Sequence, residues 1–329
     1  MRALIEAYDA ALFDLDGVIY LGPHALEGVP EALRALRDSG ANIGFVTNNA
    51  ARTPFTVAEH LVQLGIAATE SDVVNSTQAT LRMLAADLPA GARVLVVGTS
   101  ALTRQLADAG FTPVHTLDQE PVAVVQGYHP DVDWKLLELG AIAIQGGAAW
   151  YATNPDMTRP TERGILPGCG AQVAVVRACV DVEPKVAGKP FRPLLDETVL
   201  RLGAKRPVFV GDRIDTDIMG ANNVGMDSLF VFTGAHGKAD LAAAPAVGRP
   251  THIAWDVAGL LRPARQAVVE NGRATVGAET VEIRGDAVAL LSRPSDREAQ
   301  LDALWAALKL VWSTGATARG VLDDLDLLR

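Results

Sequence analysis

The sequence Ala10-Ala11-Leu12-Phe13-Asp14-Leu15-Asp16-Gly17-Val18 places two carboxylates and a glycine directly after a short apolar strand. Three other short apolar stretches, rich in strand-forming residues, predict buried strands: 42–46, 208–210 and 229–232. Helical patterns at 30–39 and 191–202 are each closed by a glycine. Strands that alternate with helices predict an α/β fold whose core is a doubly wound parallel sheet.

Polar residues follow three of these strands directly. They are Asp14, then Thr47 with Asn48, then Gly211 with Asp212. In a parallel sheet covered by helices, ligands bind beyond the carboxyl ends of the strands. The sequence therefore predicts that the chemistry lies at one edge of the sheet.

The remaining sequence predicts two further folded parts. An insertion at 80–183 has its own alternating strand and helix patterns, and we expect an α/β cap domain inserted into a core made of 1–79 and 184–261. The segment 262–329 predicts a small α+β module. Its strands meet at Asn271-Gly272 and near Gly285, and a capping box at Ser295 to Glu298 starts its helix. No chemistry can be assigned to this module.

Composition excludes several classes of protein. The formal net charge of -10 argues against nucleic acid or an anionic membrane surface as the main partner. No run of 18 apolar residues occurs and the start lacks a signal-peptide core, so we expect a cytoplasmic protein. The two cysteines, Cys169 and Cys179, lie about 15 Å apart if their segment is helical, too far for a disulfide. A homo-oligomer remains open.

The pair Asp14 and Asp16 suits transfer of a phosphoryl group. A phosphate ester repels nucleophiles and has a basic leaving group, so its hydrolysis needs a nucleophile held in line, a cation and an acid. Asp14 is the candidate nucleophile, and Asp16 is the candidate acid for the leaving alcohol and base for the attacking water. Gly17 allows the sharp turn that follows. Alone, the two acids could simply be solvated at a strand end.

A second acidic group follows the strand at 208–210, in Gly211-Asp212-Arg213-Ile214-Asp215-Thr216-Asp217. Acids at a helix start can merely complement the helix dipole. Beside Asp14 and Asp16, however, further carboxylates are unfavourable without a hard cation, and Mg²⁺ with oxygen ligands fits. We predict metal ligation by the Asp14 carboxylate, the Asp16 carbonyl and Asp212. Asp215 and Asp217 are expected to support these ligands rather than bind the metal.

Two further stretches could bind phosphate. Thr47-Asn48-Asn49 offers a hydroxyl and backbone amides at a helix start, and Lys189, between Gly188 and Pro190, supplies a positive charge. The alternative is that Lys189 is an ordinary surface lysine with no role in phosphate binding. No Walker-type loop and no His/Cys metal cluster occurs, so neither an ATP site nor a zinc site is supported.

These four motifs, in this order, resemble those of haloacid dehalogenase-type phosphatases over residues 8 to 245. The insertion, with Ala152 to Asp156 and Leu166 to Gly168, looks like the large cap of the nitrophenyl-, pyridoxal- and glycerol-phosphate phosphatase branch. The whole chain is most similar to the actinobacterial glycerol 3-phosphate phosphatases. The resemblance implies a doubly wound core, Mg²⁺ and an aspartyl-phosphate intermediate on Asp14.

The cap residues bear on the substrate. His129 stands where the branch commonly has aspartate, and Arg159 where relatives that take aromatic substrates often have histidine. Arg159 and Arg163 therefore favour a compact polar ester, although both could form surface ion pairs. The predicted reaction is hydrolysis of a small phosphomonoester, with glycerol 3-phosphate first and 2-phosphoglycolate next. The alternatives are a phosphomutase and a protein that senses a phosphometabolite.

Overall fold

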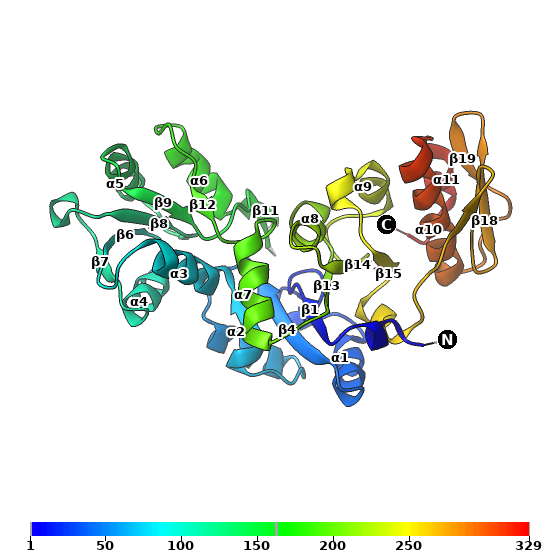
Figure 1. Cartoon of the computed structure of the whole chain (residues 1–329), viewed down its shortest axis with the longest axis horizontal. Helices are drawn as coiled ribbons and strands as arrows, with labels where there is room; N and C mark the ends of the chain where they lie inside the picture. The colour runs from blue at the N-terminus through cyan, green and yellow to red at the C-terminus, as the bar shows by residue number, and fades with distance from the viewer. Residues whose placement is uncertain (1, 162–163, 329) are drawn as a thin grey trace. The chain divides into compact units, whose positions relative to one another are not determined.

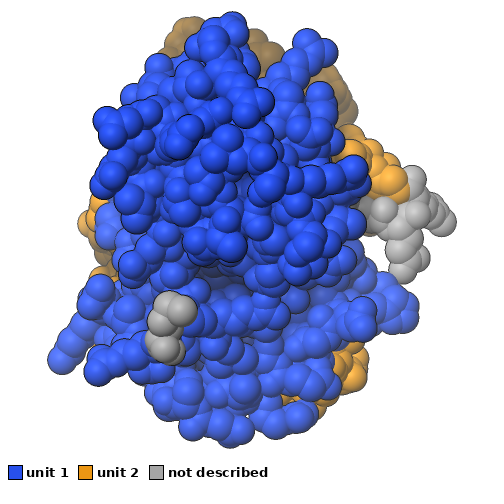
Figure 2. Space-filling view, turned by 90° about the vertical axis from the view of Figure 1, so that its right-hand side faces the viewer, with its two compact units in different colours: residues 1–43, 204–329 blue, residues 44–203 orange. Residues whose placement is uncertain are grey.

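The computed structural model describes residues 2–161 and 164–328. It divides into two compact units (Figure 2): unit 1 is Met1–Ile43 with Ala204–Arg329, and unit 2 is Gly44–Gly203. The predicted domain boundaries at 79, 183 and 261 stay predictions. No helix in the described part of the chain is both long and apolar enough to cross a membrane.

The centre of unit 1 is a parallel sheet with the strand order β15-β14-β13-β1 (Figure 1). Its strands are β1 (Ala10–Phe13), β13 (Pro207–Gly211), β14 (Asp227–Val231) and β15 (His252–Ala254). Every residue of β1 is buried, as expected for a strand covered on both faces. Helices α1 (Val29–Asp38), α8 (Met219–Asn223) and α9 (Lys238–Ala243) belong to this unit. The predicted α/β parallel-sheet core is confirmed.

Unit 2 contains a second parallel sheet with the order β12-β9-β8-β6-β7. Its strands are β6 (Arg93–Val97), β7 (Thr112–Val114), β8 (Ala123–Gln126), β9 (Ala149–Ala152) and β12 (Lys185–Val186). Along β6, Val94 and Val96 join one apolar cluster while Leu95 and Val97 join another. Because side chains alternate along a strand, helices therefore cover both faces of this sheet.

The helices of these two clusters differ. Helices α3 (Ser76–Asp87) and α4 (Ser100–Asp108) contribute to the first cluster, and α5 (Trp134–Gln145) and α6 (Cys169–Arg177) to the second. Unit 2 also contains β4 (Asn42–Thr47), which begins at the end of unit 1, β5 (Val73–Asn75), α2 (Pro54–Gln63) and α7 (Arg192–Leu202). Strands β10 (Thr158–Thr161) and β11 (Gly164–Pro167) form a hairpin.

The C-terminal module is a four-stranded antiparallel sheet beside a long helix (Figure 1). The strands are β16 (Val268–Glu270), β17 (Arg273–Val276), β18 (Glu279–Arg284) and β19 (Ala287–Leu290), followed by α10 (Arg297–Thr314) and α11 (Arg319–Asp324). The predicted Asn271-Gly272 turn is present, with both residues at positive φ. Leu304 and Trp305 of α10 share one apolar cluster with Phe232 and Leu241 of the parallel-sheet part.

The start of α10 differs from the prediction. Asp296, not Ser295, is the N-cap, and its side chain accepts a hydrogen bond from the amide of Ala299. Ser295 instead donates to the Asp296 carboxylate. A carboxylate or a hydroxyl at the N-cap can accept from an unpaired amide of the first turn. Only the carboxylate also carries a negative charge, which the positive end of the helix dipole stabilises.

Candidate active site

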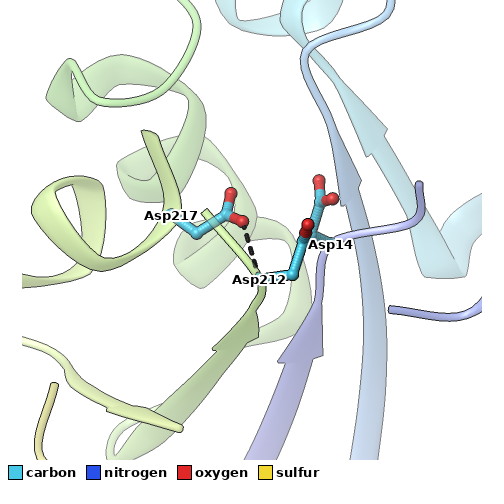
Figure 3. A group of neighbouring side chains, drawn as sticks. All are labelled: Asp14, Asp212 and Asp217. Carbon is cyan, nitrogen blue, oxygen red and sulfur yellow. Dashed lines mark hydrogen bonds between the residues drawn. The ribbon is translucent and has the colours of Figure 1, made fainter. Parts of the chain in front are cut away.

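Three carboxylates gather at the carboxyl ends of β1 and β13 (Figure 3). Asp14 follows β1, Asp212 follows β13, and Asp217 lies in the π-helical turn Ile214–Ile218. One oxygen from each of the three lies within 4.8 Å of the others. Asp212 and Asp217 are each only 1% exposed. This is the edge of the sheet at which the sequence predicted the chemistry.

Backbone amides hold the two buried carboxylates. Asp217 Oδ2 accepts from the amides of Asp212 (3.2 Å) and Arg213 (3.1 Å). Asp212 Oδ2 accepts from the amide of Ala235 at 2.5 Å, and the amide of His236 donates to the Asp212 carbonyl at 3.3 Å. These bonds fix the two carboxylates in place.

Three glycines surround the cluster because no side chain fits there. A Cβ on Gly234 would lie 1.9 Å from Asp212 Oδ2, and one on Gly211 would lie 2.3 Å from the Cβ of Asp217. Gly17 has φ +90°, and a Cβ there would lie 2.8 Å from Asp212 Oδ2. The Thr233 hydroxyl donates to the Gly17 carbonyl at 2.6 Å. The predicted turn at Gly17 therefore also lets the loop at Thr233–Ala235 approach the acids.

The donor set fits a hard divalent cation. Three carboxylates held this close together repel one another, and burial strengthens the repulsion. Oxygen ligands of this kind suit Mg²⁺. Asp14 and Asp212 were predicted as ligands. Asp217 was predicted to support them, yet its carboxylate lies in the same group.

Asp16 and Asp215, the other two acids of these motifs, are exposed and are not part of the group of three carboxylates. Asp16 is exposed, in the tight turn that leads into β2 (Tyr20–Leu21), and it forms an isolated bridge with Tyr20. Asp215 is also exposed and pairs with Arg213 at 2.9 Å. An exposed carboxylate can exchange protons with water. The predicted roles of Asp16 and Asp215 stay predictions.

A second cluster, in unit 2, is organised by Asn48. Its carboxamide oxygen accepts from the Lys189 amide at 2.8 Å, and its nitrogen donates to the Lys189 carbonyl and to Asp156 Oδ1, both at 3.0 Å. Thr47 lies at the end of β4 and its hydroxyl accepts from the amide of Asn49 at 3.1 Å. The side chain of Lys189 is 1% exposed, so it is not an ordinary surface lysine.

Sequence reasoning missed the residues that hold Asn48. The Asn154 side chain and the Ser76 hydroxyl both donate to the Asn48 carbonyl, at 2.7 and 2.6 Å. Asn154 and Asp156 were quoted only as part of the resemblance, and Ser76 was not named. The contacts join positions 28 to 108 residues apart, which no local pattern indicates.

Arg159 lies on β10, where its guanidinium carbon is 4.8 Å from the centre of the Tyr128 ring. Its Nε is buried and makes no hydrogen bond with the described residues. Gln172 anchors the neighbouring loop by accepting from the His129 amide and donating to the His129 carbonyl. Arg163 lies outside the described residues.

The Cys169 thiol is not suited to nucleophilic chemistry. Burial raises the pKa of the Cys169 thiol to about 11, so it stays protonated at neutral pH. Cys179 is exposed, and both cysteines are free.

Two family models match the chain. One, described as haloacid dehalogenase-like hydrolase, matches residues 11–112, and one described as HAD-hydrolase-like matches residues 186–260. The first range contains Asp14, Asp16 and Asn48, and the second contains Lys189 and Asp212.

Curated relatives agree with these models. The D-glycerol 3-phosphate phosphatase of Mycobacterium tuberculosis is 44% identical over 260 residues, which cover 79% of this chain and 73% of that protein. The 5'-nucleotidase YutF of Bacillus subtilis is 34% identical over 250 residues, which cover 75% of this chain and 95% of that protein. A crystal structure of glycerol phosphate phosphatase from M. tuberculosis in complex with magnesium matches with a TM-score of 0.86 and 38% identity, over 97% of this chain and 94% of that chain.

Proposed function

The chain belongs to the haloacid dehalogenase-like hydrolase family, and from this membership we propose that it is a Mg²⁺-dependent phosphatase that hydrolyses glycerol 3-phosphate. The observation that carries the proposal is the group formed by Asp14, Asp212 and Asp217 at the end of β1 and β13. The named activity of the relative at 44% identity supports the substrate. 2-Phosphoglycolate is the next candidate.

Asp14 is the nucleophile in this proposal. Its carboxylate oxygen attacks phosphorus, the bond from phosphorus to the ester oxygen breaks, and Asp16 gives its proton to the departing alkoxide. Asp16 then takes a proton from water, the resulting hydroxide attacks the phosphorus of the aspartyl-phosphate, and inorganic phosphate leaves. Asp14 is regenerated as a carboxylate. The exposed position of Asp16 supports this exchange of protons with water.

Asp14, Asp212 and Asp217 would hold Mg²⁺, together with the Asp16 carbonyl. When bound, the ion supplies the positive charge that offsets both the clustered carboxylates and the phosphate. The amides of Ala235, Asp212 and Arg213 keep the carboxylates from turning away when the ion is absent. The ligand geometry is therefore prepared by the protein.

The residues of unit 2 supply phosphate recognition in this proposal. Lys189 contributes a positive charge, and Thr47, Asn48 and Asn49 line the phosphate in this proposal. The Thr47 hydroxyl accepts from the Asn49 amide and can still donate its own hydrogen to a phosphate oxygen. The side-chain carboxamide of Asn48 holds Lys189, so its role in this proposal is to position the lysine. The backbone N–H of Asn48 is the group proposed to bind the phosphate. Arg159, whose buried Nε makes no hydrogen bond within the described part of the chain, would bind oxygen atoms of the alcohol part of the substrate.

Phosphate release from a panel of esters tests the proposal. The panel contains glycerol 3-phosphate, 2-phosphoglycolate, pyridoxal phosphate and a nucleoside 5'-monophosphate, each with Mg²⁺ and with a chelator, and Asp14→Asn is the control. We expect release only with Mg²⁺ and intact Asp14, fastest from glycerol 3-phosphate. An isomeric ester without free phosphate would indicate a phosphomutase. Binding without turnover would indicate a sensor. Faster phosphate release from the nucleoside 5'-monophosphate than from glycerol 3-phosphate would overturn the proposed substrate.

A further inference from the structure

His236 lies in the loop between β14 and α9, beside the acidic cluster. The same loop supplies the amide of Ala235 to Asp212 Oδ2. The amide of His236 donates to the Asp212 carbonyl at 3.3 Å, and its ring Nδ1 accepts from the amide of Ile214 at 2.9 Å. His236 therefore holds the segment from Asp212 to Ile214 at both ends, once through its backbone and once through its ring.

The amide of Ile214 needs a side-chain acceptor because Ile214 begins the π-helical turn. The first amides of a helical turn have no carbonyl partner within the turn. Those of Asp212 and Arg213, just before the turn, donate to Asp217 Oδ2. The next amide, that of Ile214, donates to His236 instead. Ile214 is buried, and a buried amide without a partner is unfavourable.

The position of Asp217 depends on the same turn. The amides of Asp217 and Ile218 both donate to the Arg213 carbonyl, at 3.0 and 3.1 Å. The turn is thus a hydrogen-bonded unit that begins at the residue held by His236 and carries the Asp217 carboxylate. Groups that hold metal ligands in place affect the affinity for the metal although they do not touch it.

We propose that His236 is a positioning residue for Mg²⁺ binding. By holding the Ile214 amide, its ring fixes the π-helical turn and with it the Asp217 carboxylate. One oxygen of that carboxylate lies within 4.8 Å of oxygens of Asp14 and Asp212, where the ion would bind. The inference rests on the Mg²⁺ site of the proposed function, and it extends that site to a residue that is not one of the proposed ligands.

The test follows the amide signals of the full-length protein labelled with ¹⁵N-isoleucine by NMR. The signals of Ile214 and Ile218 are assigned with Ile214→Val and Ile218→Val. The protein is freed of metal with a chelator, the chelator is removed, and Mg²⁺ is titrated. The shift of the Ile218 signal then gives the dissociation constant for Mg²⁺. Solvent exchange of the Ile214 amide, measured before Mg²⁺ is added, reports on the bond to His236 itself.

Two replacements separate the acceptor of His236 from its shape. His236→Asn keeps an oxygen acceptor near the place of Nδ1, whereas His236→Leu has a side chain of similar size without an acceptor. His236→Leu should weaken Mg²⁺ binding at least about tenfold, as for other groups that support metal ligands, and should speed exchange of the Ile214 amide. His236→Asn should stay within about threefold of the wild type, because its acceptor can still hold that amide.

His252→Leu is the matched control. It makes the same exchange of side chain on β15, in the same unit, where the imidazole contacts the hydroxyl of Tyr8 at 2.9 Å instead of the acidic cluster. It should destabilise the protein in urea and keep the wild-type dissociation constant for Mg²⁺. Weaker Mg²⁺ binding that only follows from lower stability would appear in both leucine variants.

Three results would overturn the inference. They are equal Mg²⁺ affinity in the wild type and in folded His236→Leu, an equal loss in His236→Asn and His236→Leu, and fast exchange of the Ile214 amide in the wild type. His236→Ala takes the place of His236→Leu if the latter does not fold. A wild type that binds no Mg²⁺ would overturn the Mg²⁺ site of the proposed function and this inference with it, which distinguishes that failure from the other three.

Discussion

The side chain of Asn48 holds the backbone of Lys189 on both sides, accepting from its amide at 2.8 Å and donating to its carbonyl at 3.0 Å. Both residues are buried, at 7% and 1% exposure. In the proposed function Lys189 binds phosphate, and a backbone that is already fixed lowers the conformational entropy that is lost on binding. We therefore regard Asn48 as the residue that positions Lys189.

Replacing Asn48 by Ala should destabilise the protein and weaken substrate binding. The change removes three hydrogen bonds, two with the buried backbone of Lys189 and one with the Asp156 carboxylate. We expect a loss of about 2–4 kcal/mol in urea unfolding and a raised KM. Asn49→Ala is the control for stability, since its exposed side chain accepts from the amide of Ala51 and its loss should cost about 0.5 kcal/mol. Equal losses in both variants would contradict the positioning role.

Asp16→Asn should affect substrates according to their leaving groups. Glycerol 3-phosphate releases a basic alkoxide that needs a proton, whereas nitrophenyl phosphate releases a weakly basic phenolate. Loss of the acid should therefore reduce turnover of glycerol 3-phosphate by about 10²–10⁴-fold and that of nitrophenyl phosphate much less. Turnover numbers for both substrates at saturating concentration check this. A uniform loss would show that Asp16 acts in some other way.

Gly234→Ala should disturb the acidic cluster. The new methyl group would lie 1.9 Å from Asp212 Oδ2, so either the carboxylate or the loop must move. We expect a loss of about 1–3 kcal/mol of stability and a higher Mg²⁺ concentration for half-maximal activity. Gly320→Ala is the matched control, because nothing lies within 4 Å of the added atom and its position in α11 favours Ala by up to about 1 kcal/mol. An unchanged Mg²⁺ concentration for half-maximal activity in Gly234→Ala would contradict the claim that the contact between position 234 and Asp212 matters for Mg²⁺ binding.

The buried strands were predictable because their signal is local. The stretches at 10–13, 42–46 and 208–210 are short and apolar, and they lie in β1, β4 and β13. A strand covered on both faces is apolar along its length. By contrast, β5 and β15 have three residues each and include polar ones. A run of three residues carries too little pattern to distinguish a strand from a loop.

The part played by Asp217 could not be predicted, because it depends on an unusual turn. The amide of Ile218 bonds to the carbonyl of Arg213, five residues back, at 3.1 Å. This π-helical turn brings the Asp217 carboxylate over the amides of Asp212 and Arg213. Such turns occur as single insertions in helices and have no reliable sequence signature. The acidic motif shows that these residues are close in sequence, but it does not show how their carboxylates are arranged in space.

Leu304→Ala in α10 should destabilise the parallel-sheet part together with the C-terminal module. Leu304 is fully buried in the cluster that also contains Phe232 and Leu241. We expect a loss of about 2–5 kcal/mol in calorimetric unfolding, with unit 1 still unfolding in one transition. Leu291→Ala is the control, since Leu291 is 44% exposed and its loss should cost about 1 kcal/mol or less. A separate early transition of the module alone would contradict the shared core.

The last prediction concerns pH. Tyr8 donates to Asp227 Oδ2 and contacts His252 Nε2, both at 2.9 Å. Burial lowers the pKa of His252 below its ordinary value of about 6.5, although the Asp227 carboxylate acts in the opposite sense. The unfolded chain therefore binds a proton near pH 6.5 that the folded chain resists, so stability falls as the pH falls through this value.

His252→Gln should reduce this pH dependence. We expect the free energy of unfolding in urea to fall less between pH 7.5 and pH 5.5 in this variant than in the wild type. His24→Gln removes an exposed histidine and should behave like the wild type. A wild-type stability that rises as the pH is lowered would reverse the sign of the argument, because it would mean that the folded protein binds the proton more tightly than the unfolded chain does.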